Sequence, residues 1–474
     1  MQSYQEHLVS QFLKDRHPYL EEPFTSEIDP SQVTLAVFFR QIPKLAEALR
    51  FESLPDHLQK DALHTLNELV SDPSKKDTMT SNELLKLCGE LLESKNEGVR
   101  KEAALLIGGL VVLMNARDLV VESQVMPVLQ EHLTDFSLEV REAVAWALCR
   151  LSGSRDGVDR LVETVTVGVM VKAFIHYSKS EDTLFLMLLL EAFINLSEYD
   201  DGIEGMLGTG LTKSLIALLG NCNEDLAKRT LHVLMQIGMN HQGKQEGVAE
   251  NAIASMENFL VEEKSLETRR IAAALVMSLT INNNGKVKAV ATQQGKHPKI
   301  LKLLYKCLLT SEEGLRVNSK QAIHNISDLP AGFEYSVSIL SKNLEILDEV
   351  FSYKAIKPLL RLLPKLNTYK EPPKLDSSKL GHHQRYLKAI HFLTSKYPEA
   401  ITEAIDTVNV AQKLGPFLSD ESGVGKETAS TLKVICQKDT HNGEVLLAFI
   451  EKYGGEGIKR TMVKYSDLMA VISK

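Results

Sequence analysis

The fold is decided by the stretch Val125-Met-Pro-Val-Leu-Gln-Glu-His-Leu-Thr-Asp135, Phe136-Ser-Leu-Glu-Val140 and Arg141-Glu-Ala-Val-Ala-Trp-Ala-Leu-Cys-Arg-Leu151. In the first and third segments, apolar residues recur at intervals of three and four, the spacing that puts them on one face of an α-helix. The middle segment is expected to be a turn. Ser152-Gly-Ser-Arg-Asp-Gly157 follows as a glycine-rich turn that ends the second helix. Residues 125–157 therefore predict two amphipathic helices, each followed by a turn.

This pattern recurs along the chain. Each copy ends in an aliphatic residue, here called a landmark, that closes a small-and-leucine-rich helical stretch: Leu69, Leu110, Leu151, Leu196, Ile237, Leu279, Ile326, Leu393 and Ile435. Subtracting neighbouring positions gives intervals of 41, 41, 45, 41, 42, 47, 67 and 42 residues. A helical period of about 40–47 residues is typical of an armadillo or HEAT solenoid. We therefore predict an all-α, right-handed superhelical solenoid of about nine repeats, which offers a long binding surface because each repeat stacks on its neighbours.

Arginine stands ten residues before four of the landmarks, at Arg100, Arg141, Arg269 and Arg316. This position falls at the start of the last helix of a repeat. We expect these side chains to lie along the surface and to bond to carbonyl or acidic groups of the adjacent turn. The alternative interpretation is an arginine ladder with a binding role.

Composition limits the classes of partner. The chain has 474 residues, 44% hydrophobic and only 6% aromatic, which favours Leu/Ala/Val-packed helices over sheets. The net charge of −8 gives no global reason to expect nucleic-acid binding. Residues 1–16 do not resemble a secretory segment, and the most apolar run, residues 184–190, is far shorter than the roughly 20 residues of a membrane span. We expect a soluble cytoplasmic protein that binds neither nucleic acid nor membrane.

No motif points to catalysis, a metal or a cofactor. The five cysteines are widely spaced without a CxxC pair, so we expect buried, reduced thiols. The closest histidine group, His382 and His383 with His391, has no acidic or cysteine partner near it in sequence. Residues 423–428 lack the first glycine and the final Ser or Thr of a phosphate-binding loop, and we expect a turn that leads into a helix there. We predict a protein that is not an enzyme; the alternative is an enzyme with an unrecognised site.

Two segments depart from the repeat. Residues 1–31 are expected to form an N-terminal arm before a solenoid that spans 32–474. The interval of 67 residues contains a proline-rich stretch, which predicts a loop inserted at about 364–384. Its local excess of Lys and Arg makes it a candidate contact for a polyanion or an acidic partner, and a solvated, disordered loop is the alternative. Residues 328–352 also run longer than a simple turn.

The residue before each landmark is expected to face the inner groove that the third helices of an armadillo array line. Four of these residues are candidates for protein binding: Arg150, Asn195, Gln236 and Asn325. Asn195 and Asn325, with Gln236 between them, resemble the asparagine ladder by which armadillo proteins hold an extended peptide, because amides both donate and accept hydrogen bonds. The alternative is hydrogen bonding between repeats. Trp146-Ala-Leu-Cys-Arg150 resembles the importin-α family, but the single tryptophan and the arginine in place of asparagine argue against nuclear import.

Four segments carry a narrower resemblance. Residues 42–49 and 62–73 resemble the opening repeat of the radial spoke protein 14 family, armadillo proteins of motile cilia, and residues 272–286 and 315–332 are similar to its later repeats. The likeness covers roughly residues 35–335; the N-terminal arm and the last 120 or so residues are not matched. It implies a structural component of the axonemal radial spoke, part of the cytoskeleton, which docks between other spoke subunits near the microtubule doublet. The alternative function is a soluble cytoplasmic adaptor that binds extended peptides in the groove.

Overall fold

The computed structural model describes residues 15–16, 41–51, 53–80, 82–291, 298–363, 377–407, 410–419, 423–453, 463 and 465–473. Every regular element in these ranges is a helix. The chain divides into two compact units, unit 1 (Met1–Glu250) and unit 2 (Asn251–Lys474). None of the described helices is long and apolar enough to cross a membrane.

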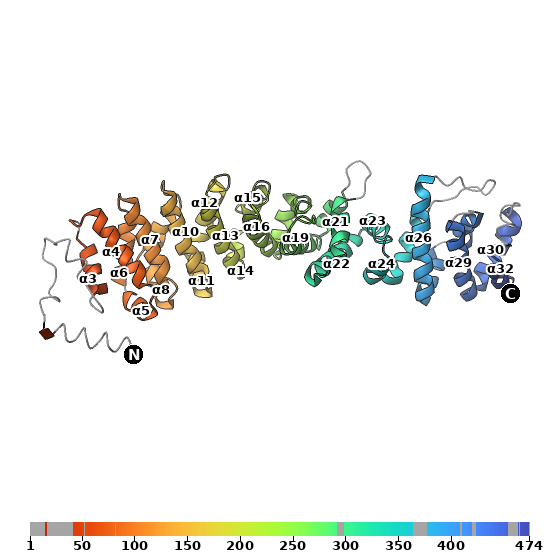
Figure 1. Ribbon diagram of the computed structural model, residues 1–474, viewed down its shortest axis with the longest axis horizontal. Coiled ribbons are helices and arrows are strands. Elements are labelled where there is room, and N and C mark those ends of the chain that lie inside the picture. The colour runs from red at the N-terminus through yellow and green to blue at the C-terminus, as the bar shows by residue number, and fades with distance from the viewer. Residues whose placement is uncertain are drawn as a thin grey trace. The chain divides into compact units, whose positions relative to one another are not determined.

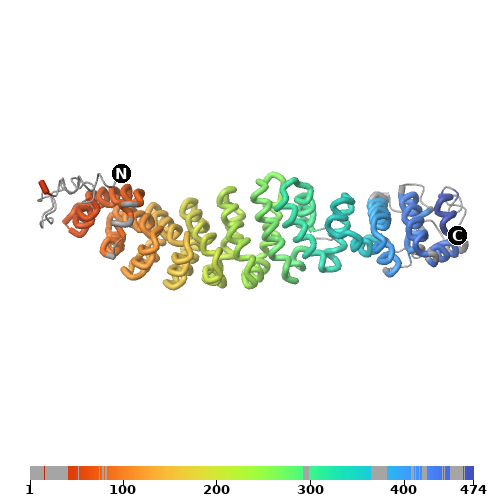
Figure 2. Tube along the Cα trace, turned by 90° about the horizontal axis from the view of Figure 1, so that it is seen from below, coloured from red at the N-terminus to blue at the C-terminus, as the bar shows by residue number. Residues whose placement is uncertain are grey.

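Unit 1 is a stack of three-helix repeats in which each third helix is the longest and ends at or next to a landmark. The described part of its first repeat contains α3 (Gln41–Leu49) and α4 (Asp56–Leu69). The next four are complete: α5 (Pro73–Met79), α6 (Asn82–Leu92), α7 (Glu97–Leu110); α8 (Met114–Glu122), α9 (Val125–His132), α10 (Leu138–Ser152); α11 (Arg155–Glu163), α12 (Thr166–Tyr177), α13 (Thr183–Leu196); and α14 (Asp200–Met206), α15 (Leu211–Leu218), α16 (Glu224–Ile237). The unit ends with α17 (His241–Ala249), the first helix of the sixth repeat. Its repeats follow one another in chain order (Figures 1 and 2).

Unit 2 continues the pattern. Its helices are α18 (Ala252–Met256), α19 (Leu266–Leu279), α20 (Asn283–Val290), α21 (Lys299–Leu308), α22 (Glu313–Ser327), α23 (Pro330–Leu340), α24 (Leu344–Phe351), η3 (Ser352–Ala355), α25 (Ile356–Leu362), α26 (Ser377–Lys396), α27 (Pro398–Thr407), α28 (Val410–Leu414), η4 (Gly415–Ser419), α29 (Gly423–Lys438), α30 (Thr440–Tyr453) and α32 (Ser466–Ile472). The third helices are α19, α22, α26 and α29. The predicted all-α solenoid is therefore confirmed.

Burial of the landmarks explains why they recur. Eight of the nine are buried, at most 1% exposed, while Leu69 in the first repeat is half-buried. Polar residues set where several third helices begin. The side-chain oxygen of Asn96 accepts hydrogen bonds from the backbone N–H groups of Gly98 and Val99, at 2.9 and 3.3 Å, and the side-chain oxygen of Asn223 accepts one from Leu226 at 2.9 Å. Such caps satisfy donors that have no partner in the first turn of a helix.

The glycines after the landmarks do not form the expected turns. Gly157 lies inside α11, six residues after Leu151, and glycine occupies the same place in the first helix of four other repeats: Gly202, Gly243, Gly285 and Gly332. A Cβ atom at any of these five glycines would stand 1.7–2.2 Å from the carbonyl oxygen of the preceding landmark. The glycine therefore serves close packing between repeats rather than a turn.

Of three segment boundaries predicted from the sequence, the structure corrects two and agrees with the third. Residues 328–352, expected to run longer than a simple turn, mostly form α23 and α24. The second part of the predicted loop at 364–384 is helical, because α26 begins at Ser377; its buried His383 therefore lies in a helix rather than a flexible loop. Gly423 begins α29, as predicted. The rest of the loop, residues 364–376, and all of the arm at 1–31 except residues 15–16 lie outside the described residues.

Candidate functional site

Three of the four arginines ten residues before the landmarks are buried rather than on the surface, and three of the four bond to carbonyl or acidic groups as predicted. Arg100 is 3% exposed; its Nη1 donates to the carbonyl oxygens of Ser94 and Lys95 at 2.9 and 3.2 Å. Its Nε and Nη2 donate to both carboxylate oxygens of Asp135 in the next repeat, at 2.9 and 3.0 Å. The expected surface position is wrong because the two groups satisfy each other: a guanidinium that reaches a bidentate carboxylate can be buried.

The same contact recurs one repeat further. Nη1 of Arg141 donates to the carbonyl oxygens of Asp135 and Phe136, and its Nη2 donates to Asp182 of the next repeat at 2.6 Å. The guanidinium lies 4.5 Å from the ring centroid of Tyr177. We call this arrangement the arginine clamp: an arginine that bonds to the carbonyls six and five residues before it and to an acid of the following repeat.

In unit 2 the equivalent arginines bond differently. Arg269 is buried, and its Nη2 donates to Sγ of Cys307 at 3.5 Å. Arg316 is partly exposed, and its Nη2 donates to Glu349 at 2.9 Å. All four arginines therefore join structural elements of neighbouring repeats, which favours the structural interpretation over a binding ladder.

The third helices of unit 1 share an uncovered face. It consists of the side chains one, five and nine residues before each landmark, and all but Gly109 are exposed or half-buried: Lys60, His64, Glu68, Lys101, Leu105, Gly109, Glu142, Trp146, Arg150, Met187, Glu191, Asn195, Lys228, His232 and Gln236. We call it the third-helix face. Two ion pairs join neighbouring helices beside it: Lys101 with Glu139 at 2.7 Å, and Arg229 with Glu191.

The predicted binding residues differ in whether their side chains already make hydrogen bonds within the chain. Nδ2 of Asn195 donates to Ser152 of the previous repeat at 3.0 Å. In unit 2, Nδ2 of Asn325 donates to the carbonyl oxygen of Met277 at 2.9 Å, and its Oδ1 accepts from Gln321 at 3.0 Å. The inter-repeat hydrogen bonds of the alternative interpretation are thus present. The side-chain amide of Gln236 makes no hydrogen bond to any described residue.

Arg150 belongs to a line of three side chains on α10. Its guanidinium lies 5.6 Å from the ring centroid of Trp146, which is one turn earlier, and Glu142 is one turn before Trp146. Glu142 forms no ion pair within the described residues; burial, then the charges of Asp182 and Glu139, raise the pKa of its carboxyl group. The line thus places an acid without an ion-pair partner, a half-buried tryptophan and an exposed arginine on successive turns of one helix face.

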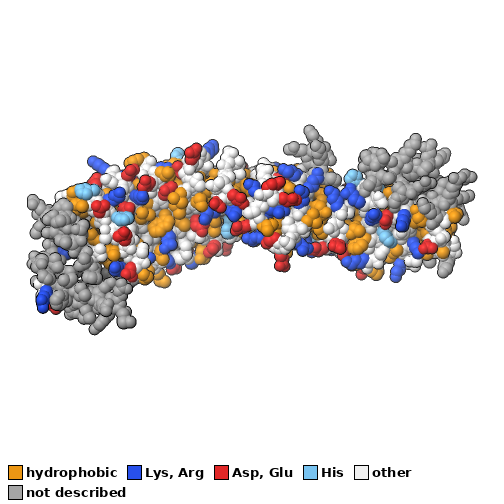
Figure 3. All heavy atoms as spheres, viewed as in Figure 1, with side chains coloured by type: hydrophobic (Ala, Val, Ile, Leu, Met, Phe, Trp, Pro, Cys, Tyr) orange, Lys and Arg blue, Asp and Glu red, His pale blue; other side chains and the backbone are white. Residues whose placement is uncertain are grey.

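Two exposed leucines stand at the starts of α10 and α13, the third helices of the third and fourth repeats. Leu138 at the start of α10 is 38% exposed, and Leu184 at the start of α13 is 52% exposed. Hydrophobic side chains also gather over the middle of unit 1 on the side seen in Figure 3, between charged ones. Among the described residues, no three His, Cys, Asp or Glu side chains are arranged to hold a metal ion.

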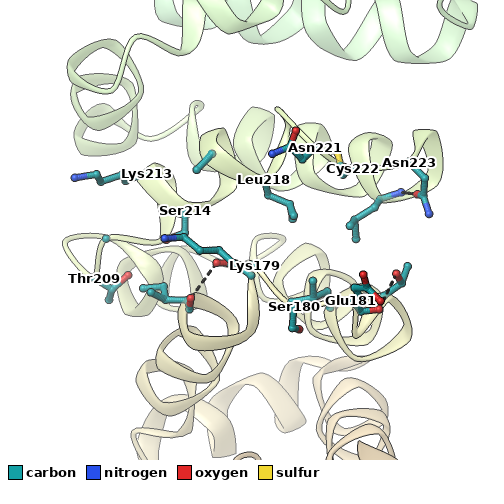
Figure 4. Close-up of a pocket in the computed structure, with 17 residues that line it drawn as sticks. Lys179, Ser180, Glu181, Thr209, Lys213, Ser214, Leu218, Asn221, Cys222 and Asn223 are labelled. Carbon is teal, nitrogen blue, oxygen red and sulfur yellow. Dashed lines mark hydrogen bonds between the residues drawn. The ribbon is translucent and has the colours of Figure 1, made fainter.

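A cavity of about 1100 Å³ opens between the fourth and fifth repeats of unit 1. The fourth repeat lines it with residues 178–181, Thr183 and Leu186, and the fifth with α15 and residues 221–223. Lys179 and Lys213 reach toward one end, whereas Glu181 and Asn223 lie at the other (Figure 4). Sequence reasoning missed this cavity.

Comparison with known proteins supports the fold and goes no further. No protein-family model matches the chain, and no curated protein matches it. The crystal structure of an engineered protein is similar, with 20% identity over 91% of this chain and 99% of that chain, and a TM-score of 0.52. A designed armadillo repeat protein in complex with the peptide (KR)4 is 20% identical over 50% of this chain and 99% of its own, with a TM-score of 0.45. Another designed armadillo repeat protein is 18% identical over the same shares, with a TM-score of 0.44.

Proposed function

We propose that the chain is a non-enzymatic scaffold that holds protein partners on the third-helix face of unit 1. The observation that carries this proposal is the line of Glu142, Trp146 and Arg150 on α10. A half-buried aromatic group between an unpaired acid and a cation gives a partner one apolar anchor and two charges of opposite sign. Tryptophan and arginine are enriched among the residues that dominate protein–protein binding energy.

Within that function, we propose a role in the radial spoke of the ciliary axoneme, where the chain belongs to the cytoskeleton of the cytoplasm. This part rests on the resemblance of residues 42–49, 62–73, 272–286 and 315–332 to the radial spoke protein 14 family. The partners are then other spoke subunits near the microtubule doublet. Fractionation of cilia tests the location: the protein is expected in salt-resistant axonemes, and a purely soluble cytoplasmic pool contradicts the proposal.

A photo-crosslinker tests the surface. Benzoylphenylalanine at position 184, which is exposed at the start of the neighbouring third helix α13, is expected to capture radial spoke subunits in intact axonemes. The matched control carries the crosslinker at position 172 on α12, which is also exposed but lies on a second helix. Equal capture from both positions, or capture from position 172 alone, would place the partner surface elsewhere. Mass spectrometry of the crosslinked peptides identifies the partners in either case.

One observation favours the second candidate, an adaptor for extended peptides: the side-chain amide of Gln236 has no partner among the described residues. An extended peptide offers backbone donors and acceptors that such an amide can satisfy. Asn195→Ala with Gln236→Ala is expected to abolish peptide capture. Asn325→Ala is the control within unit 2, because both ends of that amide are already bonded. Capture that survives the double substitution rejects the adaptor.

A further inference from the structure

The cavity between the fourth and fifth repeats of unit 1 has an uneven distribution of charge. Of the residues that line it, only Lys179, Glu181 and Lys213 are charged, so the lining is net positive in a chain whose net charge is −8. Both lysines are exposed, and neither ammonium group forms an ion pair or a hydrogen bond within the described residues. They reach toward one end of the cavity, whereas Glu181 lies at the other (Figure 4). One end therefore offers two cations that the chain leaves without an anion.

Two arginines also connect these repeats, but each of them already has a carboxylate. Arg155 pairs with Asp201 at 2.6 Å, and Arg229 pairs with Glu191. None of these four residues lines the cavity. The carboxylates of this junction thus neutralise the arginines, and an anion from outside the chain is needed to neutralise the two lysines.

The floor of the cavity is aliphatic. It consists of Leu186, Leu218 and Leu226, each at most 8% exposed, and we call these three residues the leucine floor. The side chain of Leu218 points into the space between the two repeats (Figure 4). An apolar group that leaves water to cover the leucine floor gains free energy in proportion to the area that it buries. The floor therefore favours a ligand that carries an aliphatic group beside its anion.

The polar groups of the lining favour a peptide over a simple aliphatic anion. Three hydroxyl groups of the fourth repeat donate to nearby backbone carbonyls and so present their oxygen to a ligand: Ser178, Ser180 and Thr183. Across the cavity, the side-chain amides of Asn221 and Asn223 can donate. A peptide backbone supplies both N–H and C=O groups to such a lining, whereas a fatty carboxylate supplies acceptors alone.

We propose that this cavity binds an acidic segment of another protein, whose carboxylate pairs with Lys179 and Lys213 while a neighbouring aliphatic side chain packs on the leucine floor. The volume of about 1100 Å³ exceeds what one side chain fills, so residues on both sides of the acid enter as well. None of the lining residues belongs to the third-helix face. The site therefore stands or falls independently of the proposed function.

Peptide binding to the full chain tests this assignment. The probe is acetyl-Ser-Leu-Glu-Leu-Ser-amide, which carries leucine on both sides of the acid so that either chain direction is allowed. One analogue replaces the glutamate with glutamine, and a second replaces both leucines with serine. We expect calorimetric binding of the acidic peptide at millimolar concentration or below, and binding about tenfold weaker for each analogue. No binding of the acidic peptide at millimolar concentration, or equal binding of either analogue, overturns the proposal.

Octanoate separates a protein segment from a free amphiphile, because it has a carboxylate and an aliphatic chain but no peptide group. We expect it to bind more weakly than the acidic peptide. Octanoate that binds as tightly as the peptide would assign the cavity to a small amphiphilic anion and overturn the proposal.

Variants of the lining locate the site. Lys179→Gln combined with Lys213→Gln is expected to weaken the acidic peptide at least tenfold, because it removes both cations. Lys172→Gln is the matched control, since Lys172 is exposed on α12 outside the lining, and it should leave binding unchanged. Ala217→Trp fills the cavity from its exposed rim and should abolish binding. If that variant fails to fold, the lysine variants still decide: equal binding by the double variant and the control overturns the proposal.

The thiol of Cys222 reports where the peptide binds, because it lines the cavity and is half-buried. Saturating acidic peptide is expected to slow its reaction with Ellman's reagent several-fold, and the glutamine analogue at the same concentration should slow it less. An unchanged reaction rate in the presence of bound peptide would place the peptide elsewhere and overturn the proposal.

Discussion

A Cβ atom at Gly157 would stand 1.7 Å from the carbonyl oxygen of Leu151, so the start of α11 can approach the end of α10 only because position 157 has no side chain. The landmark and the glycine six residues later thus form one packing unit. Its recurrence in five repeats fixes how each new repeat starts on the previous one. In the repeat after Leu110, Ala116 holds this place and is fully buried, so this junction accommodates one methyl group.

Gly157→Ala is therefore expected to lower the free energy of unfolding by about 1–3 kcal/mol, because overlap with a backbone carbonyl forces the two helices apart. Gly168→Ala is the matched control, since a Cβ there meets nothing within 4 Å in α12. Gly168→Ala should raise the free energy of unfolding by about 0.5–1 kcal/mol, because alanine favours the helix more than glycine does. Urea unfolding followed by circular dichroism measures both. Equal destabilisation would show that loss of glycine, rather than this contact, is responsible.

Sequence reasoning identified the repeat because burial of one helix face imposes the same spacing on every copy. It found all nine landmarks and the third helices that they close. It placed the arginines on the surface because it could not see that Asp135 and Asp182 of the next repeat reach them. It missed the cavity for the same reason: the residues that line the cavity come from two neighbouring repeats. Contacts between repeats can be predicted only when the three-dimensional register of the repeats is known, whereas patterns within one repeat can be predicted from the sequence.

Arg100→Met should cost about 3–5 kcal/mol of folding free energy, because it leaves the buried Asp135 carboxylate without its cation. Adding Asp135→Leu is expected to recover a large part of this loss, since no charge then stays unpaired. The exposed pair of Arg160 and Asp118, at 2.8 Å, is the control. Arg160→Met should change stability by no more than about 1 kcal/mol. A similar loss of folding free energy in Arg100→Met and Arg160→Met would contradict the role of burial.

The carboxyl groups of Asp135 and Glu142 should make the free energy of unfolding depend on pH in opposite directions. Burial alone would raise the pKa of Asp135, but hydrogen bonds from Arg100, the Ser137 N–H and His132 outweigh it and lower the pKa. A lowered folded pKa stabilises the fold above the unfolded value, about 3.9, and this contribution is lost as pH falls through the folded pKa. Asp135→Asn should thus be strongly destabilising at pH 7 and progressively less so as pH falls below about 3.9, in urea titrations at each pH.

The contribution of Glu142 to stability depends on pH in the opposite direction to that of Asp135. Burial, then Asp182 and Glu139, raise the pKa of its carboxyl group, so its contribution to stability is present below the unfolded value and is lost as pH rises through the folded pKa. Glu142→Gln is expected to be neutral or stabilising at pH 7 while it weakens partner capture. Such a trade-off is typical of a residue kept for binding. A destabilised Glu142→Gln variant would instead indicate a structural role for the acid.

Burial should order the reactivity of the thiols. It raises the pKa of Cys88 to about 12 and that of Cys436 to about 11, so neither forms thiolate near pH 8. Cys222 is half-buried and lines the cavity between the fourth and fifth repeats. With Ellman's reagent at pH 8, Cys222 should react before Cys88, which needs urea. The fast phase of the reaction should disappear in Cys222→Ser. If the fast phase persists in that variant, it belongs to another cysteine.

Trp146, the single tryptophan, makes the third-helix face directly observable. Its ring is half-buried, with the Arg150 guanidinium 5.6 Å from the ring centroid. Arg150→Ala should expose one side of the indole to water and shift its fluorescence emission to longer wavelength, with little change in stability because the arginine is exposed. A partner bound on this face should shift the emission to shorter wavelength. Arg160→Ala on α11, whose guanidinium pairs with the partly exposed carboxylates of Asp118 and Glu163, is the control for loss of an arginine elsewhere. An unchanged spectrum in Arg150→Ala would mean that the stacking does not persist in solution.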